Sequence, residues 1–320
     1  SLTMANHYLL KQVEVSTPLI TDDNVVLLRL GELCNYKCPM CPISGDAERL
    51  KSSISDLSTK IESLAAKGFR RIAITGGEPT LHPDFTNVVK KMSEHLIKWK
   101  INTNASKFTL KLARYCLDNG LYEAIVSLHS HDPSASGQIF GGTNELHGKT
   151  INGINSLLSV GVTVMINCVI NKLNASHLVD FVDYIYSLYG NRVSVKFAFP
   201  NGQGVGKDWA GVDIKYSEIK DSLSKAFQHA VDYGINVELE GIPNCILDFS
   251  HYKNYSRFSW GETHYQDELD VDKIWLIKER ESLSSYYAVK CSKCKRIDDC
   301  SGITYQYFSR YGFKELTPIQ

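Results

Sequence analysis

Short apolar runs alternate with longer amphipathic stretches through about the first 240 residues of the chain. The runs are bounded by Gly, Pro, Asn or Asp and several are rich in Val and Ile, which is typical of buried β-strands. The predicted strands are Val25–Leu30, Arg71–Thr75, Lys100–Thr103, Ala124–Leu128, Val162–Ile170, Val193–Phe199 and Ile235–Leu239.

The stretches between these runs have the spacing of amphipathic helices. Leu57, Ile61 and Leu64 lie on one helical face, and Gly68 is a stop signal after them. The same pattern recurs at residues 83–96, 177–190 and 216–234. Strands that alternate with helices form βαβ units with a parallel sheet. The predicted fold class is therefore α/β, a partial (β/α)6 TIM-like barrel, whose chemistry would lie where the strands end.

The strand–helix rhythm ends near residue 240. The remaining segment is rich in Tyr, has few clean helical faces and contains Cys245, Cys291, Cys294 and Cys300. A small loop-rich domain of this kind usually needs a metal group to hold it together. The expected domains are an N-terminal extension at residues 1–24, the barrel at residues 25–240 and a small C-terminal domain at residues 241–320.

Composition and charge narrow the class of protein. Hydrophobic residues make up 43% of the 320 residues, which supports a folded core. The 35 basic residues equal the 35 acidic ones, which argues against nucleic acid or an anionic membrane as a partner. We find neither an apolar run of about eighteen residues nor the residue order of a signal peptide. Nine cysteines then point to the reducing cytoplasm, where clustered thiols usually bind metals or act in catalysis.

The first cysteine cluster follows the first predicted strand. Cys34, Cys38 and Cys41 offer three soft thiolates, which suit zinc, copper(I) or an iron–sulfur cluster. Structural zinc uses four ligands, and no His or Cys close by completes the set; His82 and Cys168 could do so only if the fold brought them near. A [4Fe–4S] cluster explains three thiolates better, because its fourth iron stays open for another ligand. Zinc and unpaired structural cysteines remain the alternatives.

A second cluster lies near the C-terminus. Cys291, Cys294 and Cys300 form a CxxCx5C run, and Cys245 upstream would supply a fourth thiolate. Four thiolates hold either zinc or a fully coordinated [4Fe–4S] cluster. The two other cysteines, Cys116 and Cys168, fall in a predicted helix and strand, and we expect them in the core.

The first cluster resembles a known family. "CNYKCPMC" resembles the CxxxCxxC motif of the radical S-adenosylmethionine (radical SAM) enzymes, and "RRIAITGGEPTLHPDF" at residues 70–85 is similar to the GGEP segment of that family. The likeness continues through "INTNAS" and "IVSLHSHDP" and covers roughly residues 25–200. It implies a [4Fe–4S] cluster on Cys34, Cys38 and Cys41.

The resemblance also implies a reaction. In the family the open iron binds the amino nitrogen and carboxylate of SAM. One electron from the cluster then cleaves SAM to a 5′-deoxyadenosyl radical, which abstracts a hydrogen atom from the substrate. A low-potential electron donor such as flavodoxin or ferredoxin is the implied protein partner.

Several residues match family positions that contact SAM. The GGEP segment binds the SAM amino group in the family, and Glu78 would supply the anion, although an ordinary strand-to-helix turn explains the same residues. The residue before the third cysteine is usually aromatic and near the adenine, whereas here it is Met40. The SAM contacts implied by the resemblance are Tyr36, Met40, Gly76, Gly77, Glu78, Pro79, Thr103, Asn104, Ser127 and His129. Caps and loop hydrogen bonds are the structural alternative for the last four.

The second cluster resembles part of the SPASM or twitch domains, which carry auxiliary iron–sulfur clusters. The full SPASM pattern has a further cysteine where this chain has Thr304. The resemblance therefore implies one auxiliary [4Fe–4S] cluster on Cys245, Cys291, Cys294 and Cys300.

The function expected from these features is a radical SAM oxidoreductase or transformase that acts on a small molecule or a peptide. Relatives with such domains act on peptides, nucleotides and aminoglycosides. The alternatives are a non-catalytic iron–sulfur electron carrier and a radical SAM RNA-modifying enzyme, the latter disfavoured by the neutral charge.

Overall fold

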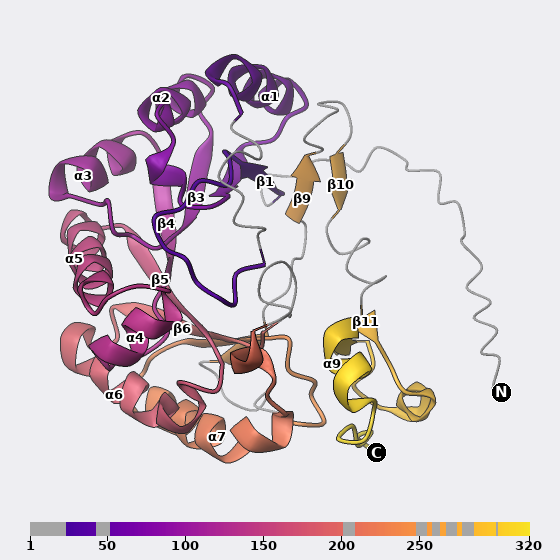
Figure 1. The fold of residues 1–320 in the computed structure, drawn as a ribbon. Helices are drawn as coiled ribbons and strands as arrows, with labels where there is room; N and C mark the ends of the chain where they lie inside the picture. The colour runs from indigo at the N-terminus through magenta and orange to yellow at the C-terminus, as the bar shows by residue number, and fades with distance from the viewer. Residues whose placement is uncertain are drawn as a thin grey trace.

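The computed structural model describes residues 24–42, 52–200, 209–247, 255–257, 263–266, 274–276, 285–298 and 300–320. In this part of the chain a strongly curved sheet has helices along its convex side (Figure 1). The expected N-terminal extension lies outside the described residues except for Asn24.

Seven parallel strands form the body of the sheet, and they pair in chain order. All seven predicted strands are confirmed, with the third and fourth starting earlier than expected. The strands are β1 (Val25–Arg29), β2 (Arg71–Thr75), β3 (Lys98–Thr103), β4 (Leu121–Ser127), β5 (Thr163–Val169), β6 (Val193–Ala198) and β7 (Val237–Glu240). The sheet is open, as predicted for a partial barrel.

Most of the helices cover the outer face of the sheet through apolar stripes. Leu57, Ile61 and Leu64 are fully buried in the core, as their spacing predicts. Ser53 starts the first helix through a capping box with Asp56. The helices are α1 (Ile54–Ala66), α2 (Phe85–Glu94), α3 (Leu110–Asp118), α4 (Pro133–Ile139), α5 (Glu145–Val160), α6 (Leu178–Tyr189), α7 (Tyr216–Asp232) and α9 (Tyr305–Tyr311), with short 3-10 turns at η1 (Pro79–Leu81), η2 (Ala175–His177), η4 (Ala210–Val212) and η5 (Val289–Lys293).

Helix α5 was not predicted from the apolar pattern, and α3 was expected only as the helix that contains Cys116. Helix α3 buries only the small side chains Ala113 and Cys116. Helix α5 contains Gly153 and buries the polar side chains His147 and Thr150, so its core stripe is interrupted. Cys116 and Cys168 are both fully buried, as expected.

Segments after β7 extend both edges of the sheet. Strand β8 (Tyr255–Arg257) pairs with β7, while β9 (Thr263–Gln266) pairs with β1 and also with β10 (Ile274–Leu276). These strands fall in the range expected for the second domain, and the boundary at residue 240 stays a prediction. None of the described helices is long and apolar enough to cross a membrane.

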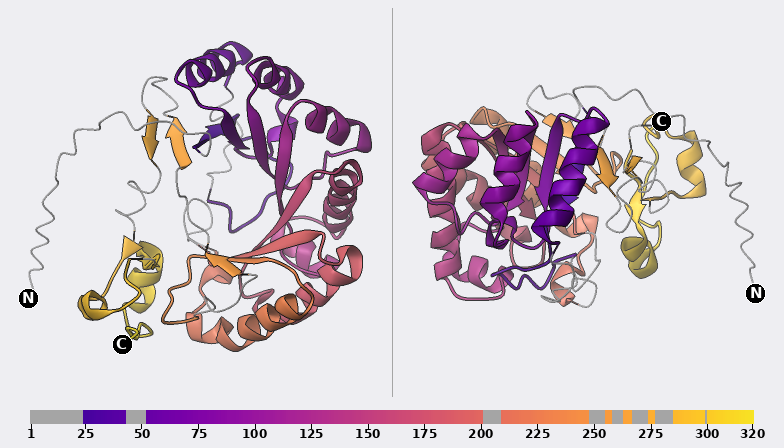
Figure 2. Two further views of the ribbon diagram at one scale, coloured as in Figure 1. Left: turned by 180° about the vertical axis from the view of Figure 1, so that it is seen from behind. Right: turned by 90° about the horizontal axis from the view of Figure 1, so that it is seen from above.

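The C-terminal segment comprises η5, α9 and the antiparallel pair β11 (Ser285–Tyr286) and β12 (Ile303–Thr304). Both views in Figure 2 place it beside the barrel rather than within the ring of helices, and Figure 1 places it next to the start of α7.

Candidate active site at the barrel mouth

The first cysteine loop is bonded to the GGEP segment through the backbone. Gly77 donates its N–H to the Gly31 carbonyl at 2.8 Å, and Glu78 donates to the Leu33 carbonyl at 2.7 Å. Both segments follow neighbouring parallel strands, so they meet at the same edge of the sheet. The two motifs that the sequence places some forty residues apart therefore form one structural unit.

This close approach explains both glycines. A Cβ atom at Gly76 would lie 2.3 Å from the Gly31 carbonyl oxygen, and one at Gly77 would lie 2.3 Å from the Leu33 carbonyl oxygen. Gly76 also has a φ of +143°, a backbone conformation that residues other than glycine rarely adopt. Any larger residue would therefore push the cysteine loop away from β2.

The burial of this loop disfavours the ionised thiolate form of its cysteines. Burial, reinforced by Glu78 and Cys41, raises the pKa of Cys34 to about 11. Burial and the two neighbouring thiols raise the pKa of Cys38 still further. A bound metal centre offsets this penalty because its positive charge favours the thiolates. The three thiols therefore fit the cluster that the motif implies.

Polar groups also approach the sulfur atoms. The Tyr36 N–H donates to Cys34 Sγ at 3.4 Å, and Asn104 Nδ2 lies 3.9 Å from the same sulfur. Such hydrogen bonds tune the potential of iron–sulfur clusters. Among the described residues no group of three His, Cys, Asp or Glu is arranged for a single metal ion. The assignment to a cluster thus depends on thiolate chemistry and motif.

Glu78 is the centre of a buried hydrogen-bond network. Its carboxylate accepts from the Thr80 N–H and hydroxyl, from the Thr103 hydroxyl at 2.8 Å and from the Asn104 N–H at 2.7 Å. Burial raises its pKa, and these hydrogen bonds oppose the shift. An ionised carboxylate can accept about four hydrogen bonds, so these four donors occupy its acceptor sites. Glu78 therefore braces the loop, and its contact with the SAM amino group stays a prediction.

Thr103 and Asn104 connect this network to the cysteine loop. The Thr103 hydroxyl also accepts the Ala105 N–H, and Asn104 Nδ2 donates to Asn35 Oδ1 at 3.0 Å. Pro79 begins the short η1 turn directly after Glu78. The structure thus brings Gly76 through Pro79, Thr103 and Asn104 together beside Cys34, while their roles toward SAM stay predictions.

His129 is buried and held as a neutral ring. Its Nδ1 accepts the Val169 N–H at 3.1 Å, so the neutral ring carries its proton on Nε2. Burial lowers its pKa to about 3, so the ring is neutral near neutral pH and is poorly suited to proton transfer there. Ser127 lies opposite Asn167 in the β4–β5 register.

Tyr36 and Met40 hold the loop to different neighbours. The Tyr36 ring packs on Phe140 with ring centroids 4.7 Å apart, and its hydroxyl donates to the Leu146 carbonyl at 2.8 Å. Met40 is buried in a small apolar cluster with Ile139 and Val212. The anchoring of Tyr36 to α5 was not foreseen from the sequence.

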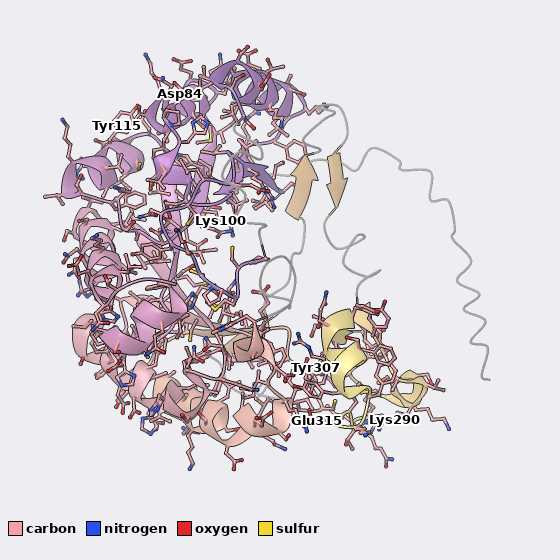
Figure 3. The ribbon with its side chains drawn as sticks, viewed as in Figure 1. Asp84, Lys100, Tyr115, Lys290, Tyr307 and Glu315 are labelled. Atoms are coloured by element: carbon pink, nitrogen blue, oxygen red, sulfur yellow. The ribbon has the colours of Figure 1, made fainter. Side chains whose placement is uncertain are left out.

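The concave face of the sheet carries charges that the sequence analysis missed. Lys196 Nζ lies 2.8 Å from Glu240 Oε2. Burial raises the pKa of Glu238, the charges of Glu123 and Glu240 add to this increase, and nearby lysines oppose it. Figure 3 shows Lys100 on this inner side. The buried Asn167 Oδ1 has no hydrogen-bond partner among the described residues. Strand alternation was the available signal, because these residues alternate with the buried apolar ones.

The second cysteine set converges in one pocket. Cys245, Cys291, Cys294 and Cys300 all line it, together with the apolar side chains of Ile297, Leu316 and Pro318. Burial raises the pKa of Cys245, and the thiols of Cys300 and Cys291 raise it further.

Backbone amides also approach this pocket. The Ile319 N–H donates to Cys294 Sγ at 3.4 Å, and the Gly302 N–H lies 3.5 Å from Cys300 Sγ. The chemistry of four soft thiols in an apolar pocket with N–H donors suits an iron–sulfur cluster or zinc, although the described thiols are not arranged around a single metal ion.

The chain matches a known family over its first half. The model of the Radical SAM superfamily matches residues 28–185. A probable GTP 3′,8-cyclase from Sulfolobus acidocaldarius is 28% identical over 201 residues, which are 62% of this chain and 63% of that protein. The chain spans between 49% and 63% of the length of the curated relatives it matches first.

Solved structures share the fold over most of the chain. SuiB of Streptococcus suis bound to S-adenosylmethionine is similar with a TM-score of 0.60 at 18% identity, over 92% of this chain and 76% of that one. The protein anSMEcpe bound to AdoMet and the Cp18Cys peptide is similar with a TM-score of 0.62 at 15% identity, over 89% and 90%.

Proposed function

Because residues 28–185 belong to the radical SAM superfamily, we propose that this chain is a radical SAM oxidoreductase or transformase with one auxiliary iron–sulfur cluster. The superfamily uses a [4Fe–4S] cluster and SAM as cofactors. The observation that carries the proposal is the backbone junction between the cysteine loop and the GGEP segment at the barrel mouth.

In this proposal Cys34, Cys38 and Cys41 hold the first cluster. The bound cluster and SAM supply the one-electron cleavage that yields a 5′-deoxyadenosyl radical. The chain's own part is placement: Glu78, Thr103 and Asn104 fix the loop through a buried network, which keeps the thiols in one geometry. The neutral His129 ring adds no acid or base there.

The auxiliary cluster is proposed for the pocket lined by Cys245, Cys291, Cys294 and Cys300. Its support is that all four thiols line one pocket although Cys245 lies far from the other three in sequence. With four protein ligands no iron is open, so the cluster would pass electrons and would not bind substrate. An oxidising reaction needs such an acceptor for the second electron.

The proposed substrate is a small molecule or a peptide. A nucleotide is suggested by the curated relative named as a probable GTP 3′,8-cyclase, and a peptide by the solved structure that contains Cp18Cys. GTP and a cysteine-containing peptide are therefore the first probes. A low-potential flavodoxin or ferredoxin is the proposed electron donor.

Metal counting under anaerobic conditions tests the proposal. We expect about eight irons and eight sulfides per chain. Replacing Cys34, Cys38 and Cys41 together by Ala should leave about four irons and abolish SAM cleavage, whereas replacing Cys291 and Cys294 should leave four irons with SAM cleavage retained. Zinc in place of iron, or iron lost from both sites at once, would contradict it.

A further inference from the structure

Helix α7 begins without a side-chain cap of its own. The residue before its first turn is Lys215, whose side chain makes no capping hydrogen bond. Its backbone N–H is itself bonded to Glu218 at 2.7 Å, which leaves the next amides to other partners. The first four N–H groups of a helix need acceptors from outside it. The start of α7 therefore depends on a distant part of the chain.

Glu315 supplies these acceptors from the C-terminal segment. The Ser217 N–H donates to Glu315 Oε1 at 3.0 Å, and the Tyr216 N–H is shared between Glu315 Oε2 and the Tyr307 hydroxyl, each at 3.2 Å. The Tyr307 hydroxyl also donates to this carboxylate. Figure 3 shows Tyr307 and Glu315 facing the start of α7. An anion at this end of a helix also gains from the helix dipole.

The same contact borders the second cysteine pocket. Leu316, the residue after Glu315, and Pro318, three residues after it, line the pocket beside the four thiols. The adjoining Ile319 carbonyl accepts the Lys295 N–H at 3.0 Å within the cysteine loop. A shift of Glu315 would therefore move the wall of the pocket.

An aromatic stack adds to the contact between α7 and the C-terminal segment. The fully buried Tyr216 ring lies between Phe199, with centroids 4.4 Å apart, and Tyr307, with centroids 4.3 Å apart. Its hydroxyl donates to the Gly241 carbonyl at 3.0 Å. Phe199 follows β6 and Gly241 follows β7, so the stack connects the barrel mouth to the C-terminal segment.

We propose that Glu315 is a positioning residue that caps α7 from a distance and thereby fixes the four-cysteine pocket against the mouth of the barrel. The effect on electron transfer rests on the proposed function, because the position of the pocket matters for electron transfer only if the pocket holds the auxiliary cluster. The cap itself does not depend on the identity of the metal group.

Hydrogen exchange on the full, cluster-loaded chain tests the cap. In Glu315→Ala we expect the Ser217 amide to exchange about tenfold faster, as for the loss of a helix cap, and the Tyr216 amide, which keeps the Tyr307 hydroxyl as an acceptor, to accelerate by a smaller factor. Glu315→Gln keeps one of the two acceptor oxygens and should restore the protection of the Ser217 amide. The matched control is Lys314→Ala, an exposed neighbour, which should change neither amide. Unchanged exchange in Glu315→Ala would overturn the proposal.

A spectroscopic readout separates positioning from general stability. With both clusters reduced, the magnetic coupling between them should weaken or broaden in Glu315→Ala and return in Glu315→Gln, while SAM cleavage stays within about twofold of wild type. Unchanged coupling in a well-folded Glu315→Ala protein would overturn the positioning role.

A milder variant tests the cap if Glu315→Ala does not fold, and the iron content tests the auxiliary cluster separately. If Glu315→Ala does not fold, Tyr307→Phe removes one donor that holds the carboxylate in place and should raise exchange of the Ser217 amide by a smaller factor. Unchanged exchange of the Ser217 amide in this variant would count against the proposal. Four irons per wild-type chain would refute the auxiliary cluster, and with it the positioning role, while accelerated exchange would still support the cap.

Discussion

At the scale of single residues, the site depends on positions where nothing larger fits. Gly77 lies against the Leu33 carbonyl, and the Glu78 carboxylate accepts hydrogen bonds from four donors, two of them in its own turn. The sequence motif identified these residues but not their contacts. Two of the hydrogen bonds of Glu78 come from Thr103 and Asn104 at the end of the next strand. The spacing of these residues in the sequence does not reveal that they lie close to Glu78 in the fold.

Substituting Gly77 should uncouple the cysteine loop. In Gly77→Ala the new methyl group would meet backbone atoms at 2.3 Å, so we expect a loss of about 1–3 kcal/mol in the free energy of unfolding and a loss of iron from the first cluster. The control is Gly148→Ala in α5, where nothing lies within 4 Å and a gain of about 0.5–1 kcal/mol is expected. Urea unfolding and iron content measure both, and equal effects at the two positions would contradict the account.

The buried His129 should make stability depend on pH. Its pKa is lowered to about 3 from 6.5, so the unfolded chain binds more protons between these values. The stability that comes from the neutral ring is present above about pH 6.5 and is lost as the pH falls below it. Between about pH 7 and 5.5 the free energy of unfolding should fall by about 1.2 kcal/mol more in wild type than in His129→Asn.

A variant at a buried residue that does not titrate provides the control for this pH effect. Thr150 is fully buried, and Thr150→Val should keep the wild-type pH dependence. Urea unfolding at the two pH values measures the difference. If His129→Asn loses stability on acidification as steeply as wild type, the ring does not make the expected contribution.

At the scale of elements, strand alternation decides which side chains reach the interior of the barrel. The apolar residues of β6 and β7 face the helices, and the residues between them, Lys196, Glu238 and Glu240, face the concave side. The alternation of β6 and β7 was readable in the sequence. What could not be read was which lysine pairs with which carboxylate, because this depends on the register between strands.

Removing one partner of the Lys196–Glu240 pair should cost stability. The side chains are 9% and 31% exposed, so Lys196→Met should lower the free energy of unfolding by about 2 kcal/mol, between the values for surface and buried pairs. The double variant Lys196→Met with Glu240→Gln should recover about half of this loss. Equal stability of the single and double variants, measured by urea unfolding, would contradict the pairing.

At the scale of the whole molecule, the parallel barrel was predictable because its strands and most of its helices have strong periodic patterns. The C-terminal segment has no such pattern. Its arrangement depends on long-range contacts, such as Glu315 on α7 and Cys245 beside Cys300. The edge strands β8 and β9 were likewise missed, because their three and four residues are too short to show a period.

The central claim is that three thiolates at the barrel mouth hold a cluster with one iron left for SAM. The most direct measurement is the yield of 5′-deoxyadenosine when the anaerobically reconstituted, reduced chain is mixed with SAM. We predict 5′-deoxyadenosine and methionine in equal amounts, and none from a Cys38→Ala variant. An iron-loaded wild-type chain that leaves SAM intact would contradict the account.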